Sequence, residues 1–284
     1  MMRGPAPVLS LLSFTPPGSR PDEIANAMNF YERPDYVPAE IVGAPISCEW
    51  KGAQAHIGPV ETLTPLMVQL GRGTAATQVA MCAGILLWLT WRLKTLTPVE
   101  HNLELAEAAF AYNIDWRYLD VDAGPKGKAP DQPPAESAAK KVNRWMRDAV
   151  DAETRWNSFY TAVGETFHSS HVVKFITPRR YKPDFTAWLD AVSDRMAEHF
   201  PIPDIPWREI NTFESKADCY AYRAPRRGVA IPPQVLDPSF DYRPEQREDL
   251  LREFLAGLDP SRNRYLRTPE AMLELGYEGV PYTL

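Results

Sequence analysis

The most apolar stretch of the chain runs from Thr74 to Lys94 and reads TAATQVAMCAGILLWLTWRLK. Its hydrophobic run, Val79–Trp91, is 13 residues long and is closed by Gln78 on one side and Arg92 on the other. A membrane-spanning helix needs about 20 apolar residues, so we expect no membrane span here. Because this helix has no polar face, it should lie at the centre of the protein with neighbours on all sides.

A row of small residues marks one side of this central helix. Ala76, Ala80 and Gly84 recur every four residues, which places them on one face. Small side chains let a neighbouring element approach closely. We therefore predict close packing inside the same subunit along this row, in preference to a membrane dimer motif.

Several further segments show the signals of α-helices. Thr97-Pro98-Val99-Glu100 has the pattern of a capping box and predicts a helix start. Apolar residues keep the helical period for about eight turns from Ser137, a good N-cap, to Phe167. Two shorter patterns predict helices over 183–199 and from Pro244 to about Ala256. Further on, Thr268 and Pro269 form another helix-start signal.

β-branched and aromatic residues cluster between turn formers in three short segments. These segments are 41–50, 171–176 and 218–224. Each is typical of a short strand, and together they are too few for a large sheet. The sequence therefore predicts a mainly α fold, an irregular helical bundle with a small β annex.

The prolines are distributed unevenly along the chain. Of its 28 prolines, ten fall in residues 1–65 and eight in 201–245, whereas one lies within 66–120. Proline breaks helix interiors and cannot donate to a sheet, so these segments should be extended. We expect a proline-rich N-terminal arm over 1–65, a helical core over 66–200 with a linker at 122–137, and a proline-rich segment with C-terminal helices over 201–284. Whether the N-terminal arm docks on its own core or on another chain stays open.

Composition favours a cytoplasmic protein. The three cysteines, Cys48, Cys82 and Cys219, have no metal-binding spacing and suit reduced thiols. The apolar run 8–14 is followed by prolines instead of a small-residue cleavage site, which argues against a secretory signal. The formal net charge of −6 excludes a protein built mainly to neutralise nucleic-acid phosphates.

One cluster has metal-ligand chemistry. Glu165, His168 and His171 are spaced three apart, which on a helix spreads them over one arc. Two imidazoles and a carboxylate could converge on one Zn or Fe ion. The structural alternative is that histidines in the last helical turn interact with the carbonyl groups and dipole there. We favour this structural explanation and expect no cofactor.

Two neighbouring carboxylates are candidates for acid–base catalysis. Glu104 and Glu107 lie three residues apart on one predicted helix and could act as paired carboxylates. A solvated helix face explains most pairs of this kind, and we favour that explanation.

The proline-rich segments also hold aromatic residues that could anchor a partner. Trp50, Trp207, Tyr31 and Tyr36 lie there and are the candidate partner-binding residues. We therefore expect a non-catalytic, bacterial-type cytoplasmic protein: a structural assembly subunit, adaptor or inhibitor that binds a protein partner or forms a homo-oligomer. The alternative is a small metal-dependent enzyme with Glu165, His168 and His171 as its site.

Overall fold

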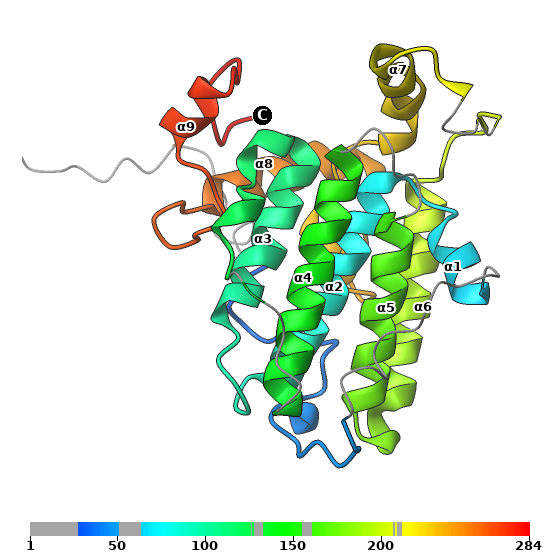
Figure 1. Cartoon of the computed structure of the whole chain (residues 1–284), viewed down its shortest axis with the longest axis vertical. Helices are drawn as coiled ribbons and strands as arrows, with labels where there is room; N and C mark the ends of the chain where they lie inside the picture. Colours follow the sequence, from blue (N-terminus) through cyan, green and yellow to red (C-terminus); the bar gives the residue numbers. More distant parts are fainter. Residues whose placement is uncertain are drawn as a thin grey trace, which may run out of the picture.

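The computed structural model describes residues 28–50, 64–125, 127, 133–154, 161–206, 208 and 212–284. In this part of the chain, α-helices form a bundle with short 3-10 turns between them (Figure 1). The α-helices are α1 (Pro65–Leu70), α2 (Ala75–Leu93), α3 (Glu100–Ile114), α4 (Pro134–Thr154), α5 (Thr161–Ile176), α6 (Lys182–His199), α7 (Lys216–Arg227), α8 (Arg247–Gly257) and α9 (Pro269–Glu274). The 3-10 helices are η2 (Ala39–Ile41), η4 (Trp116–Tyr118), η5 (Val121–Ala123), η6 (Arg179–Tyr181), η8 (Pro233–Leu236) and η9 (Pro244–Gln246).

Helix α2 is the centre of the bundle. It packs against α3, α4, α5 and α6 (Figure 1). Every residue from Ala76 to Leu93 is buried, which confirms the prediction of a core helix with neighbours on all sides. Although α2 is long and apolar enough to cross a membrane, its most apolar part lies wholly inside the protein.

The row of small residues on α2 does allow close packing within the chain. A Cβ atom on Gly84 would lie 2.8 Å from the Cδ2 atom of Leu236 in η8 and 3.1 Å from the indole ring of Trp188 on α6. Because glycine has no Cβ atom, η8 and α6 can pack closely against the central helix at this position.

The predicted helices over 183–199 and 244–256 are confirmed as α6 and as η9 followed by α8. Thr268 caps α9, and its hydroxyl oxygen accepts a hydrogen bond from the backbone N–H of Ala271.

Two predicted helix starts are wrong. Helix α3 begins at Glu100, whose own carboxylate accepts from the Val99 N–H, so Thr97 is not the cap. Helix α4 begins at Pro134, within the predicted linker, and Ser137 is buried inside its first turns.

The single eight-turn helix predicted from Ser137 to Phe167 is also wrong. The structure has two helices, α4 and α5, which pack against each other side by side (Figure 1). The intervening residues 155–160 lie outside the described part of the chain. Both helices turn apolar faces toward α2, so the helical period of apolar residues does not reveal where one helix ends.

The predicted β annex is wrong. The described residues contain no strand and have two isolated bridges, Gly73 with Pro201 and Leu119 with Leu266. Residues 171–176 are the last turns of α5, and 218–224 belong to α7. Residues 41–50 begin at the end of η2 and then turn at Gly43, which has a φ of 67°. In 171–176, burial of Val172, Val173 and Ile176 overrides the strand preference, whereas 218–224 lies in a helix that the Ser215 side chain caps.

The proline-rich arm is not extended where the structure describes it. Within residues 28–50, the side chains of Phe30, Val37 and Ile41 are buried in the main hydrophobic core. Their need for burial is met by the chain's own core. Turns at 29–32, 34–37 and 41–44, together with η2, stand where an extended arm was predicted. Residues 1–27 and 51–63 lie outside the described part.

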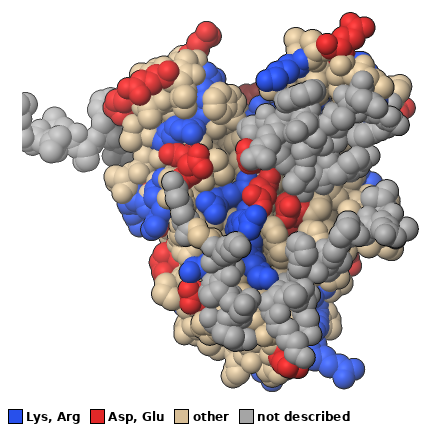
Figure 2. Space-filling model, in the orientation of Figure 1, with Lys and Arg blue, Asp and Glu red and all other residues tan. Residues whose placement is uncertain are grey.

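Charge is mixed on the face of the molecule that α4 presents. Figure 2 shows lysine and arginine side chains interspersed with acidic ones on this face. On α4 itself, Glu136 pairs with Lys140 and Arg144 pairs with Asp148, each one helical turn apart. Exposed pairs of this kind contribute little to stability.

Candidate functional site

A cavity of about 520 Å³ opens between the N-terminal segment and the C-terminal half of the chain. Its walls come from residues 28–32, Glu107 on α3, η8, and the end of α8 with the loop that follows it. Segments far apart in sequence meet here. Most ligand pockets fall in this size range and hold a few well-placed polar groups.

Three aromatic rings fix the N-terminal wall of the cavity. Phe30 lies 5.7 Å from Phe110 of α3 and 6.1 Å from Phe254 of α8, measured between ring centroids. The side chain of Asn29 accepts a hydrogen bond from the Tyr31 N–H at 3.0 Å, which closes a tight turn. Together these contacts bury Phe30 and direct the neighbouring Tyr31 toward α3.

Glu107 is the central polar group of the cavity. Its Oε2 atom accepts hydrogen bonds from the Tyr31 hydroxyl at 3.1 Å and from the Asn263 amide at 2.8 Å. Burial raises the pKa of Glu107, and the two hydrogen bonds and Arg262 oppose that rise. The Oε1 atom takes part in neither bond and remains able to accept from a ligand.

Most of the charged residues that line the cavity are acidic. Glu32, Glu107, Glu253 and Asp259 contribute carboxyl groups, whereas Arg262 is the lining residue with a positive charge. The guanidinium of Arg262 lies 5.9 Å from the centre of the Tyr31 ring. Carboxylates that line a concave surface concentrate a negative potential, which favours a cationic ligand.

The loop behind the cavity is held rigidly. Asn263 is fully buried and also donates to the carbonyl oxygen of Glu104, at 2.7 Å. The next residue, Arg264, donates from Nε to Glu104 Oε2 at 2.6 Å and from Nη2 to Oε1 at 3.2 Å. A two-bond pair of this geometry orients both groups. The wall that carries Asn263 is therefore fixed to α3.

Sequence reasoning missed this site because it assigned Glu104 and Glu107 to a solvated helix face. That assignment is wrong: Glu104 is 7% exposed, and Glu107 is hydrogen-bonded inside the cavity. A signal was present in the neighbouring residues. Apolar residues of the segment 102–113 lie on every side of α3, with a few polar exceptions. A carboxylate in this segment therefore has no solvent-exposed helix face to occupy.

The four predicted partner-binding residues have different surroundings. Tyr31 lines the cavity. Tyr36 stacks on Trp188 at 5.5 Å, and Trp50 is 5% exposed and packs 6.0 Å from Phe175. Trp207 lies outside the described residues. Of the described three, Tyr31 is the one that stands in a cavity.

The three predicted metal ligands all lie on α5, but they face different neighbours. Glu165 is half-buried, and burial together with the nearby Asp148 raises its pKa to about 7. His168 contacts Trp145 and Phe167, while His171 is exposed and packs against the Phe167 ring at 4.5 Å. In the part of the chain that the structure describes, no three His, Cys, Asp or Glu side chains are placed to hold a metal ion. The metal-enzyme alternative stays a prediction.

Comparison with known proteins adds no family to this description. No family model, no curated protein and no solved structure matches the chain. The cavity and its residues are therefore the basis for a function.

Proposed function

We propose that the protein is a non-catalytic binding protein, an adaptor, inhibitor or assembly subunit, whose acidic cavity receives an arginine side chain from a basic segment of a partner protein. The observation that carries this proposal is the position of Glu107 in the cavity, with Oε2 held by Tyr31 and Asn263. A carboxylate fixed in this way presents Oε1 to an incoming guanidinium.

The cavity supports arginine recognition in two further ways. The Tyr31 ring already has one guanidinium near it, that of Arg262, and aromatic faces attract cations. Glu32 and Asp259 are exposed and line the same cavity. These outer carboxylates suit a partner segment in which further basic residues surround the inserted arginine, because complementary charge at a rim speeds association.

Rigid walls make the cavity suitable for binding. Glu107 is on a buried helix, and Asn263 is on a loop tied to that helix. A site whose groups are already in place loses less entropy when it binds its ligand.

Two short peptides test the proposal. The first is acetyl-Gly-Arg-Gly-amide, and the second has citrulline, which keeps the shape of arginine but is neutral, at the same position. We expect the arginine peptide to perturb the NMR signals of Tyr31 and Asn263, and the citrulline peptide to bind at least about tenfold more weakly, the loss expected for one charge-assisted hydrogen bond.

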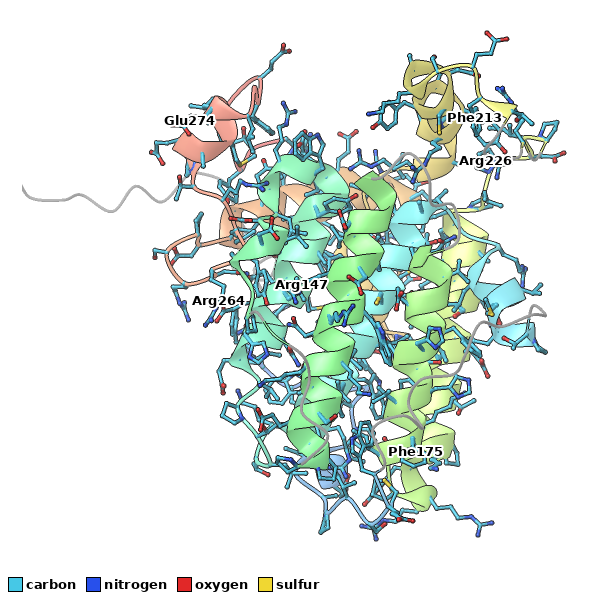
Figure 3. The ribbon with its side chains drawn as sticks, in the orientation of Figure 1. Arg147, Phe175, Phe213, Arg226, Arg264 and Glu274 are labelled. Carbon is cyan, nitrogen blue, oxygen red and sulfur yellow. The ribbon has the colours of Figure 1, made fainter. Side chains whose placement is uncertain are left out.

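Matched variants locate the binding. Glu107→Gln keeps the shape of the side chain and the oxygen that accepts from Tyr31 and Asn263, and it should weaken arginine binding by about tenfold or more. Glu274→Gln, on the exposed end of α9 (Figure 3), is the control and should bind as the unmodified protein does. Equal affinity for the two peptides, or an unchanged affinity in Glu107→Gln, would show that the cavity does not recognise arginine.

A further inference from the structure

Arg92 is a fully buried cation near the end of α2. Its Nη2 atom donates to the carbonyl oxygen of Ile176 at 3.1 Å and to that of Pro45 at 3.3 Å. Ile176 is the last residue of α5, and the preceding Phe175, labelled in Figure 3, marks this end of the bundle. Arg92 thus joins the end of α5 to the N-terminal segment.

Two other nitrogen atoms of Arg92 have no acceptor. The Nε and Nη1 atoms are buried, and neither has a hydrogen-bond partner among the described residues. The two acceptors of Nη2 are backbone carbonyl groups, and neither is a carboxylate. Arginine keeps its proton in proteins, so the positive charge persists in the interior. A buried charge without a partner is strongly unfavourable.

The surroundings of Arg92 add donors and positive charge. Thr177 directly follows Ile176, is 3% exposed, and its hydroxyl oxygen is also buried without a partner. Lys182 and Arg92 both act electrostatically on the Cys48 thiol. Burial nevertheless raises the pKa of Cys48, so the thiol is neutral at neutral pH and supplies no thiolate to balance the charge.

Arg195 shows how the same chain satisfies an arginine with carbonyl groups alone. Its two terminal nitrogens donate to the carbonyl oxygens of Val235, Asp237 and Pro238. None of its nitrogen atoms is buried without a partner. Backbone carbonyl groups alone can therefore satisfy an arginine in this fold, whereas at Arg92 two nitrogens of one guanidinium are left without an acceptor among the described residues.

We propose that Arg92 binds a small inorganic anion of the halide class, chloride in the cell, through Nε and Nη1 with help from the Thr177 hydroxyl. A monatomic anion is small and accepts hydrogen bonds from any direction, which suits the fully buried guanidinium of Arg92. It balances the guanidinium charge, which the two carbonyl groups do not. Because Pro45 contacts the same guanidinium, the anion strengthens the attachment of residues 41–45 to the ends of α2 and α5.

Thermal unfolding of the full chain tests this site. In sodium chloride and sodium gluconate solutions of equal ionic strength, we expect a higher Tm in chloride, rising to a plateau with concentration. Crystals grown in bromide should show an anomalous peak beside Arg92. A water molecule would satisfy the N–H groups without any preference for chloride, so equal Tm values in the two salts would overturn the proposal.

Two variants assign the effect to this arginine. Arg92→Met should remove the chloride dependence of the Tm, whereas Arg195→Met, which also removes a carbonyl-bound arginine, should retain it. If Arg92→Met does not fold, Thr177→Val serves in its place: it keeps the cation and should shift the chloride midpoint several-fold upward. Chloride dependence that survives in Arg92→Met, or an unchanged midpoint in Thr177→Val, would contradict the assignment.

Discussion

The hydroxyl of Tyr31 donates a hydrogen bond to Glu107 Oε2 at 3.1 Å, although the two residues are 76 positions apart. This bond joins the N-terminal segment to α3 at the cavity. It is one of two bonds that hold the Glu107 carboxylate, and the other comes from Asn263. The position of Tyr31 therefore depends on the docking of residues 28–50, and so does the chemistry of the cavity.

Tyr31→Phe removes this bond and keeps the ring. We expect the variant to lose about 1 kcal/mol of stability, the usual net value of a hydrogen bond. The pKa of Glu107, which burial already raises, should rise further because one interaction that lowers it is gone. Urea unfolding and an NMR titration of the Glu107 carboxyl carbon measure the two effects. Tyr220→Phe on α7, where the side chain is 49% exposed, is the control and should change neither quantity.

Glu165 makes the stability of the protein depend on pH. Its pKa rises from an ordinary 4.5 to about 7, with burial as the main cause. The folded state then holds the proton more tightly than the unfolded chain does, so this contribution is complete below pH 4.5 and is lost as the pH rises through about 7. Glu165→Gln, which stays neutral, should be more stable than the unmodified protein at pH 8 by about 1 to 2 kcal/mol, allowing for the partial exposure of the site.

Urea unfolding of both proteins at pH 5 and pH 8 checks this expectation. The difference in stability between them should appear at the higher pH and largely vanish at the lower one. The exposed Glu245→Gln is the control and should show no such pH dependence. A difference of the same size at both pH values would mean that packing, and not the titration of Glu165, is responsible.

Two kinds of helix could be predicted from the sequence: helices with one apolar face, and a helix that is apolar on all sides. Helix α2 was found from Val79–Trp91 because an all-apolar helix has one stable position, the centre of a core. The division between α4 and α5 was not found, because both helices bury apolar faces against α2 and the period runs through the break. The strand assignments failed in segments of six to ten residues, such as 171–176, where tertiary packing decides between helix and strand.

The cavity was largely beyond prediction because its residues meet only in three dimensions. Tyr31 was identified as a binding candidate, but for its aromatic ring and not for its bond to Glu107. Asn263 gives no local signal in the sequence: its role depends on a loop that returns to α3 after more than a hundred residues. The apolar surroundings of Glu107 in the sequence are the one feature that indicated burial of its carboxylate.

Gly84 tests the close packing of α2. In Gly84→Ala the new Cβ would approach Leu236 Cδ2 at 2.8 Å and the Trp188 ring at 3.1 Å, and we expect a loss of about 1 to 3 kcal/mol from overpacking. Gly164→Ala on α5 is the matched control, since its Cβ would meet no atom within 4 Å. That variant should gain up to about 1 kcal/mol from higher helix propensity. Urea unfolding measures both, and equal effects would show that α2 can shift to make room.

The docking of the N-terminal segment supports a last prediction, which concerns a chain that begins at Thr64. This truncation removes Phe30, Val37 and Ile41, each of them 2% exposed or less. Full burial of three such side chains stabilises a protein by roughly 5 to 9 kcal/mol, which is similar to the total stability of a typical domain. We therefore expect the truncated chain to lose cooperative thermal unfolding, as followed by circular dichroism. A chain that begins at Met28 keeps all three side chains and should unfold cooperatively. If the chain from Thr64 instead melts as sharply as the longer one, residues 28–50 contribute little to the core, and a role for them in association with another chain would regain support.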